Sequence, residues 1–170
     1  LLDHVSAWQR RAYSEPGRYV YDETPFTPLA KPLTETRIGL LSSSGHFVEG
    51  DDPMPFGVQE MTQEEALARI DDFLKSAPQL STIPIDTPPS QLHVRHGGYD
   101  VRAAQSDPNV VFPINRLCEL NREGLIGDLA PDAYSFVGAT SQLRLQKEAA
   151  PEWVALFQAQ QIEAMILIPV

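Results

Sequence analysis

The chain closes on an unbroken run of apolar and mostly branched residues, Ala164 to Val170. Such a run is typical of a strand that is buried on both faces inside a parallel sheet. Each side chain of this size stabilises the fold by about 1.5–3 kcal/mol when it is buried. The pattern therefore predicts a central strand. In an open parallel sheet, functional groups lie just beyond the carboxyl ends of the strands, so we expect the site there.

Shorter apolar segments predict the other strands, at residues 37–41, 83–85, 92–94 and 134–138. The last of these is followed by a helical pattern and then by the closing apolar run. A strand, a helix and a strand in this order favour parallel pairing with a right-handed crossover. The expected fold is α/β, a single domain with a mostly parallel sheet and helices on both faces, in a Rossmann- or flavodoxin-like arrangement.

Apolar residues spaced three or four apart predict four helices. The first covers residues 2–13; the second follows Thr62-Gln63-Glu64-Glu65, which matches a capping box. Asn115 is the expected N-cap of the third helix and Gly124 its stop, and the fourth spans residues 142–161 with a break at Pro151. The residues expected to point inward in the last three are Leu67, Ile70, Phe73, Leu74, Leu117, Leu120, Val154, Phe157 and Ile162.

Prolines mark the N-terminal part of the chain as an extended connector. Pro25, Pro28 and Pro32 fall within residues 18–36, where they are incompatible with a continuous helix. We therefore expect residues 1–36 to form a helix and a proline-rich arm that wraps along another subunit or domain. Residues 37–170 then form the α/β domain.

Composition narrows the class of protein. A chain of 170 residues with a formal net charge of −10 lacks the clustered basic residues that nucleic acid or an anionic membrane surface requires. No apolar run reaches the roughly 18–20 residues of a membrane span, and the N-terminus does not read as a secretory signal. With one cysteine an internal disulfide is impossible. A cytoplasmic protein is expected, with no nucleic-acid or membrane partner.

Several familiar motifs are missing from the sequence. It contains no glycine-rich nucleotide fingerprint, no nucleophile-elbow G-x-S-x-G and no C-x-x-C pair. The single Cys118 lies between Leu117 and Leu120 with acidic neighbours that weaken a thiolate, so we interpret it as structural.

The remaining candidates are polar loops with histidines. His96 is suited to acid–base chemistry near neutral pH, whereas His93 would face the opposite side of a strand. The acidic residues Glu49, Asp51 and Asp52 are interpreted as a solvated loop. Asp107-Pro108-Asn109 is either an ordinary turn or part of a pocket wall.

Three stretches together resemble a known family, the selenoprotein B subunits of glycine, sarcosine and betaine reductases and the related D-proline reductase subunit. The resemblance covers roughly residues 33–170 and is most specific in the middle stretch. The stretches are Leu33–Gly45, His96–Leu117 and Gly124–Gly138.

The resemblance implies a reductive cleavage of a C–N bond. In the family, a selenocysteine, or a cysteine in some members, follows the final strand, attacks the substrate as a low-pKa nucleophile and is regenerated by thiols. We therefore expect selenocysteine or cysteine directly after Val170, with the domain truncated at that point. The implied partners are a small amino-acid-like substrate and a thiol reductant or partner reductase subunit, in a homo-oligomer.

The resemblance and the strand-end rule together select the candidate site, which contains no metal. His96 and Asp100 are the candidate catalytic residues, with His96 protonating the leaving amine. Ser44 and Asn109 are expected to hold a substrate carboxylate. The full set of candidate substrate-binding residues is Ser43, Ser44, His46, Tyr99, Asp107, Asn109 and Ser135.

Two other functions stay open at this point. The chain can be a non-catalytic binding or assembly subunit that uses its proline-rich arm. It can also be a metal-dependent hydrolase, with His46, His96 and Asp100 as the ligands.

Overall fold

The computed structural model describes Asp22 and residues 27–170. The helix expected over residues 2–13 and the first part of the proline-rich arm lie outside the described residues. The strands are β1 Ile38–Ser42, β2 His46–Val48, β3 Ser81–Pro84, β4 Leu92–Val94, β5 Asp132–Ser135 and β6 Ala164–Ile168. The α-helices are α2 Gln63–Ala68, α3 Ile70–Phe73, α4 Arg102–Ser106, α5 Ile114–Arg122, α6 Gln142–Arg144 and α7 Ala150–Ala159. The 3-10 turns are η2 Leu33–Glu35, η3 Pro55–Gly57, η4 Pro89–Gln91 and η5 Pro108–Val110.

A mixed sheet of four strands forms the centre of the described part, in the order β3-β5-β1-β6. β1 is parallel to both of its neighbours, with Leu41 opposite Tyr134 and Leu40 opposite Ile166, whereas β3 is antiparallel to β5. β2 and β4 form a separate antiparallel pair. The prediction of a loop from Ser42 to Phe47 is therefore wrong at its C-terminal end, because β2 begins at His46.

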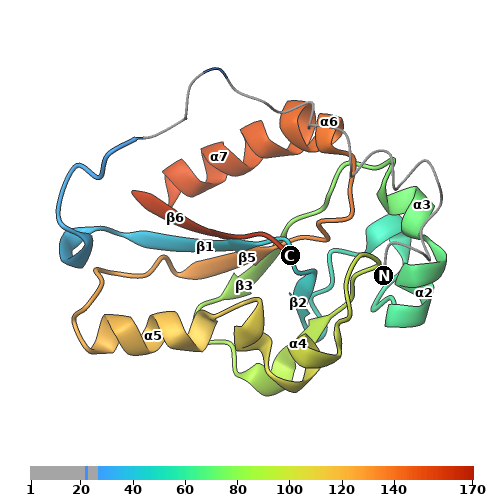
Figure 1. Cartoon of the computed structure of the whole chain (residues 1–170), viewed down its shortest axis with the longest axis horizontal. Helices are drawn as coiled ribbons and strands as arrows, with labels where there is room; N and C mark the ends of the chain where they lie inside the picture. The colour runs from blue at the N-terminus through green and yellow to red at the C-terminus, as the bar shows by residue number, and fades with distance from the viewer. Residues whose placement is uncertain (1–21, 23–26) are drawn as a thin grey trace.

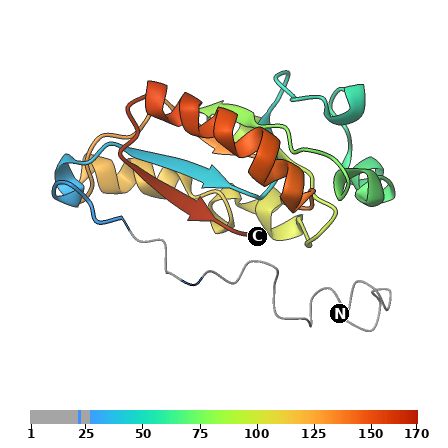
Figure 2. The same cartoon turned by 90° about the horizontal axis from the view of Figure 1, so that it is seen from above.

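Helices cover both faces of the four-stranded sheet. Figures 1 and 2 show α7 on one face and α5 on the other, with α2 and α3 grouped beside the β2–β4 pair. This confirms the expected α/β class, while the Rossmann- or flavodoxin-like arrangement stays a prediction. Within residues 27–170, no helix is long and apolar enough to cross a membrane.

The last strand is not the central one. β6 pairs with β1 alone among the described strands, and Leu167 is 65% exposed. β1 is a central strand, and its Ile38 and Leu40 are buried. β6 packs closely against Gly39 of β1, because a Cβ on Gly39 would lie only 3.0 Å from Met165 Sδ. An apolar run alone does not distinguish these positions, because an edge strand that buries only one side can be equally apolar in sequence.

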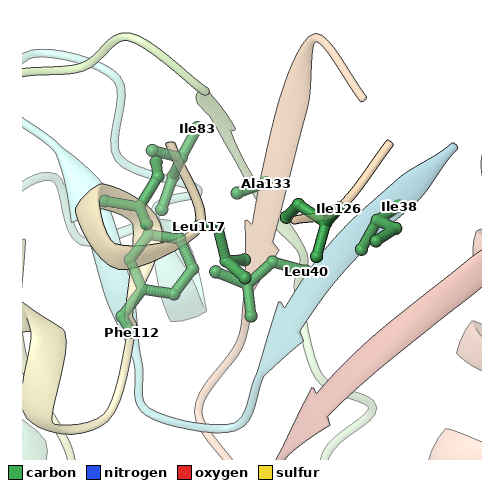
Figure 3. Packing of buried hydrophobic residues seen from close by; sticks show 8 residues of the cluster. Ile38, Leu40, Ile83, Phe112, Leu117, Ile126 and Ala133 are labelled. Atoms are coloured by element: carbon green, nitrogen blue, oxygen red, sulfur yellow. The ribbon is translucent and has the colours of Figure 1, made fainter. Parts of the chain in front are cut away.

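The main core lies between the sheet and α5. Figure 3 shows side chains from β1, β3 and β5 meeting Phe112 and Leu117. Leu117 is buried as expected, but Leu120 is on the exposed side of α5. The described members of this cluster are Ile38, Leu40, Ile83, Phe112, Ile114, Leu117, Ile126 and Ala133.

The expected helix boundaries are partly confirmed. The capping box is present, with the Glu65 amide donating to Thr62 Oγ1 at 3.2 Å and the Glu65 carboxylate accepting the Thr62 amide at 2.8 Å. Gly124 terminates α5 with φ of +70°. Asn115 is not the N-cap, because α5 begins at Ile114 and the Asn115 amide donates to Asn109 Oδ1.

The long helix expected over residues 142–161 is interrupted. A π-helical segment, η6 Leu145–Ala149, separates α6 from α7. Pro151 then lies in the first turn of α7, where its missing amide hydrogen is tolerated. The helix faces also differ from expectation: Leu67 and Val154 are exposed, whereas Ala66 and Trp153 are buried.

Candidate functional site

Ser43 joins three segments at the carboxyl edge of the sheet. Its amide donates to the carbonyl of Ile168 at 3.0 Å, and its carbonyl accepts the Gly138 amide at 3.0 Å. Its hydroxyl oxygen accepts the amide of Val170 at 2.9 Å. The end of β6 and the turn after β5 are therefore both anchored on the residue that follows β1, where the strand-end rule places functional groups.

A buried network of hydroxyl groups and one imidazole follows Ser43 at the ends of β1, β2 and β5. Ser44 Oγ is 2.7 Å from His46 Nδ1 and 3.3 Å from Ser135 Oγ. The His46 amide donates to Ser135 Oγ at 2.9 Å, and the His46 ring stacks on Phe112 at 5.2 Å between centroids. These groups hold the ends of β1, β2 and β5 together. Because they are fully buried, they position the edge from below and do not face solvent.

His96 and Tyr99 form the next layer. Tyr99 donates its hydroxyl hydrogen to the Ser44 carbonyl at 3.0 Å, and its ring centroid lies 4.8 Å from that of His96. His96 Nδ1 accepts the Gly98 amide at 2.8 Å, and Nε2 faces the Ala139 amide at 3.3 Å. Burial lowers the pKa of His96 to about 4, and the amide hydrogens facing both ring nitrogens disfavour a second proton. His96 is therefore neutral at pH 7.

We expect the free energy of unfolding to fall as the pH drops from 6.5 towards 4. Burial lowers the pKa of both His46 and His96 from 6.5 to about 4, so in this range the unfolded chain binds protons that the folded chain does not. The contribution of the neutral imidazoles is complete above pH 6.5 and is lost progressively below it. Urea unfolding at a series of pH values measures this slope.

His96→Gln should remove up to one proton from that slope. The same replacement at the exposed His93 is the matched control and should leave the slope unchanged. A slope that is equally steep in His96→Gln and in the wild-type chain would contradict the assignment of a buried neutral His96.

Three of the nine predicted site residues lie apart from this cluster. Asp100 is exposed and forms an ion pair with Arg102, whose hydrogen bonds lower the Asp100 pKa to about 2. Asp107 accepts the Asn109 amide at 2.9 Å and so caps η5, which is the ordinary-turn interpretation. Asn109 in turn accepts the Asn115 amide. The structure therefore groups Ser43, Ser44, His46, His96, Tyr99 and Ser135, but gives Asp100, Asp107 and Asn109 local partners instead.

The metal-site alternative finds no support in this arrangement. In the part of the chain that the structure describes, no three His, Cys, Asp or Glu residues converge as metal ligands. His46 and His96 each have their own ring contacts, and Asp100 faces Arg102.

Residues 79–169 match the model of the glycine/sarcosine/betaine reductase selenoprotein B family. The chain belongs to this family. The matched segment includes β3 to β6 and therefore most of the sheet.

Curated relatives in the selenoprotein B family are subunits of reductase complexes. The chain is 27% identical to the D-proline reductase subunit gamma of Acetoanaerobium sticklandii over 84% of this chain and 52% of the relative. It is 27% identical to the glycine reductase complex component B subunit gamma of Symbiobacterium thermophilum over 86% of this chain and 31% of the relative. For the sarcosine reductase complex component B subunit beta of Peptoclostridium acidaminophilum, the identity is 26% over 65% of this chain and 22% of the relative.

The chain thus spans about half, or less, of the length of these selenoprotein B relatives. No solved structure matches it.

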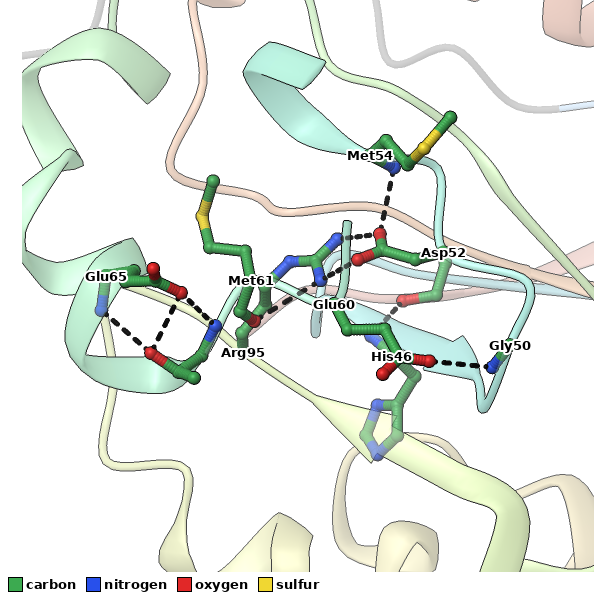
Figure 4. A network of polar contacts seen from close by, with 10 residues as sticks. His46, Gly50, Asp52, Met54, Glu60, Met61, Glu65 and Arg95 are labelled. Carbon is green, nitrogen blue, oxygen red and sulfur yellow. Dashed lines mark hydrogen bonds and ion pairs between the residues drawn. The ribbon is translucent and has the colours of Figure 1, made fainter. Parts of the chain in front are cut away.

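Among the described residues of this selenoprotein B chain, Arg95 and Asp52 form a buried ion pair that the sequence did not reveal. Arg95 Nη1 donates to Asp52 Oδ2 at 2.7 Å, Nη2 contacts Oδ1, and both side chains are at most 2% exposed. The guanidinium also lies 4.2 Å from the centroid of the Phe47 ring. Figure 4 shows this pair between β4 and the loop after β2.

The interpretation of Asp52 as part of a solvated loop is therefore wrong. In the sequence, Asp52 is indistinguishable from Glu49 and Asp51, which do lie on the surface. The sequence gives only a weak indication that Arg95 is buried: it directly follows an apolar strand segment and directly precedes His96.

Proposed function

We propose that this chain is part of the subunit of a reductase complex that bears the selenocysteine or cysteine, and that it forms the cradle of the substrate site. The observation that carries the proposal is the hydrogen bond from the Val170 amide to Ser43 Oγ at 2.9 Å. This bond directs the chain after β6 across the carboxyl edge of the sheet. A nucleophile placed directly after Val170 then lies beside the cluster of Ser43, Ser44 and His46.

The proposed reaction is the reductive cleavage of a C–N bond in a small amino-acid-like substrate. The selenolate or thiolate forms a bond to the substrate carbon, and the C–N electron pair leaves with the nitrogen, which takes up a proton. Two thiols of a reductant or partner subunit then supply two electrons and a proton. The Se–C or S–C bond breaks, the substrate carbon leaves as C–H, the thiols become a disulfide, and the selenolate or thiolate is regenerated.

Within this proposal the clustered residues have distinct roles. Ser43 positions the backbone that leads to the nucleophile, while Ser44, His46 and Ser135 hold the strand ends beneath it. His96 lies beside Tyr99 and is the proposed proton donor to the leaving amine. Because it is neutral and both ring nitrogens face backbone amides in the free chain, this role requires that substrate binding releases one of these contacts and that His96 gains a proton. Asp100, Asp107 and Asn109 are proposed as the outer rim of the site, with Asn109 towards the substrate carboxylate. Ser44, expected from the sequence to share that role, is buried and bonded to His46, so only its positioning role is proposed.

The deciding experiment uses the chain together with the residues that follow Val170 in the native gene. We expect substrate-dependent oxidation of a dithiol by this longer protein, and its loss when the selenocysteine or cysteine is replaced by serine. Activity of the chain ending at Val170 would contradict the role assigned to the following residue. An ordinary stop codon after Val170 with no further reading frame would also contradict it.

Ser43→Ala tests the positioning role in the same protein. Loss of one hydrogen bond worth about 0.5–1.5 kcal/mol should loosen the path of the chain after β6 and lower turnover by roughly twofold to tenfold. The circular dichroism spectrum should be unchanged, and the free energy of unfolding in urea should fall by no more than the worth of this one bond. Ser90→Ala, at an exposed residue of η4, is the control. Turnover that is equal in Ser43→Ala and Ser90→Ala would rule out the positioning role.

A non-catalytic assembly subunit is the second candidate. The feature that favours it is the exposure of β6 and of the residues that follow it. β6 pairs only with β1 among the described strands, Leu167 in β6 is 65% exposed, and Val170 beyond its end is 41% exposed. A stable complex with a partner reductase subunit, without any substrate-dependent thiol oxidation by the longer protein, would favour this function over the first.

Four further properties of the protein are proposed from the sequence. The separation of residues 1–36 as an arm, the Rossmann- or flavodoxin-like arrangement, a homo-oligomer and a cytoplasmic location all stay predictions. Size-exclusion chromatography with light scattering tests the oligomer directly.

A further inference from the structure

A cavity opens at the carboxyl edge of the sheet beside, but not within, the serine and histidine cluster. Its volume is about 420 Å³, within the roughly 300–1,000 Å³ of small-molecule sites. Walls come from the turn after β1, the η3 loop, the end of α3, the start of β3, the segment after β5, and α6. The lining residues used below are Phe56, Phe73, Ala77, Arg95, Phe136 and Arg144.

No acidic side chain lines this cavity, although the chain as a whole is acidic. The sequence carries 23 acidic and 13 basic residues, yet two arginines and no aspartate or glutamate line the cavity. Arg95 is already neutralised by the buried Asp52. Arg144 pairs with Glu148, which does not line the cavity, but the two side chains are 47% and 51% exposed. Such a surface pair is weak, so Arg144 is the cation that a ligand can reach.

Arg144 retains donors for a ligand. Glu148 occupies its Nε and Nη2 at 2.9–3.1 Å, and no described residue accepts a hydrogen bond from Nη1. Nε of Arg95 is also buried without a hydrogen-bond partner among the described residues. Guanidinium groups bind carboxylates with particularly good geometry, so these donors match an acid group.

The remaining wall of the cavity is apolar and aromatic. Phe56 and Phe73 meet edge to face at 4.9 Å, and Phe136 is backed by Trp153 at 5.0 Å. Phe56 adopts a left-handed backbone with φ of 56°, as does Met54 with φ of 50°. Such strain in residues other than glycine costs about 1–3 kcal/mol each and occurs preferentially at ligand sites.

We propose that this cavity binds an organic carboxylate with an apolar body and no amino group, anchored by Arg144. No carboxylate lines the cavity, and the neighbouring Glu148 is already engaged by Arg144, so an ammonium group in the cavity lacks a partner. This class of ligand differs from the amino acids in the relatives' names. The inference is independent of the proposed reductase reaction, because it concerns binding to the 170-residue chain itself.

Isothermal titration of the chain with 3-phenylpropionate tests the inference. We expect saturable binding, at least tenfold weaker binding of phenylalanine, which differs only by its ammonium group, and equally weak binding of 3-phenylpropanol, which lacks the acid. Inorganic phosphate should not compete. Absence of binding, equal affinity for phenylalanine, or displacement by phosphate would each overturn the proposal. Turnover of the longer protein is measured separately, so failure here is distinct from failure of the reductase assignment.

Variants at the anchor sharpen the test. Arg144→Gln should weaken the affinity for 3-phenylpropionate by about tenfold, as expected for a lost hydrogen bond to a charged group. Glu148→Gln should increase it, because it frees the second edge of the guanidinium. Arg116→Gln is the matched control, since Arg116 forms an equally exposed pair with Glu119 on α5. Equal affinities in Arg144→Gln and Arg116→Gln would overturn the role of Arg144.

A second variant tests the place of binding without altering charge. Ala77→Phe fills the cavity from the segment between α3 and β3 and should abolish binding while the circular dichroism spectrum is retained. Binding that survives in a folded Ala77→Phe chain would place the ligand elsewhere and overturn the proposal.

Discussion

Gly45→Ala is expected to destabilise the chain by about 3–5 kcal/mol, the sum of backbone strain and steric overlap. Gly45 has φ of +79°, and a Cβ there would lie 2.1 Å from the carbonyl oxygen of Arg95. The contact is with backbone, so no side chain can turn away to relieve it. The strands themselves must move, which disturbs the turn that leads from Ser44 to His46.

The hydrogen bonds of Gly45 would be lost in the same movement. Its amide donates to the Phe136 carbonyl at 2.9 Å, and its carbonyl accepts the Arg95 amide at 3.2 Å. Gly45 therefore joins the ends of β1 and β4 to the segment after β5. We expect turnover of the longer protein to fall together with stability.

Gly50→Ala is the matched control for this substitution. Gly50 has the same φ of +79°, but nothing lies within 4 Å of its added Cβ. It should cost only about 1 kcal/mol, from the left-handed backbone alone. Urea unfolding of both variants separates the two contributions. Equal losses at Gly45 and Gly50 would show that the contact with Arg95 is not present in solution.

Asp52→Ala should cost about 3–5 kcal/mol, because it leaves the guanidinium of Arg95 buried without a counter-charge. Both partners of this pair are almost completely buried, and the bond from Arg95 Nη1 to Asp52 Oδ2 is 2.7 Å long. In that setting the loss reflects the cost of an uncompensated charge more than the strength of the pair. The free energy of unfolding in urea measures it.

A double variant distinguishes these two contributions. Asp52→Leu combined with Arg95→Met removes both charges and should cost clearly less than Asp52→Ala alone. Asp51→Ala, at the exposed neighbouring acid, should change stability by less than about 0.5 kcal/mol. If Asp52→Ala behaves like Asp51→Ala, the pair is solvated and the buried arrangement is wrong.

Local patterns predicted the features that depend on neighbouring residues in the sequence. The strand at Ile38–Ser42, the capping box at Thr62 and the glycine stop after α5 all follow from side chains within a few positions of one another. Their physical causes are local, namely branched side chains, one side-chain acceptor and one left-handed residue.

Burial proved harder to predict because it depends on distant segments. Phe73 is buried as its spacing predicts, but Leu67 and Val154 have the same spacing and are exposed, while their neighbours Ala66 and Trp153 are buried. Asp52 and Asp51 are adjacent and chemically identical, and only the approach of Arg95 from β4 separates a buried ion pair from a surface charge.

The sequence by itself determined the α/β class, the strand-end location of the hydroxyl-rich turn and, through its motifs, the selenoprotein B family. These conclusions depend on the order of residue types along the chain, which can be analysed without the tertiary contacts. Only the tertiary structure decided that β6 lies at the edge among the described strands and that Ser43 binds the Val170 amide. It also decided that His96 is buried and neutral while Asp100 is paired outside the cluster. Those outcomes depend on contacts between segments up to 127 residues apart, whose geometry no local pattern contains.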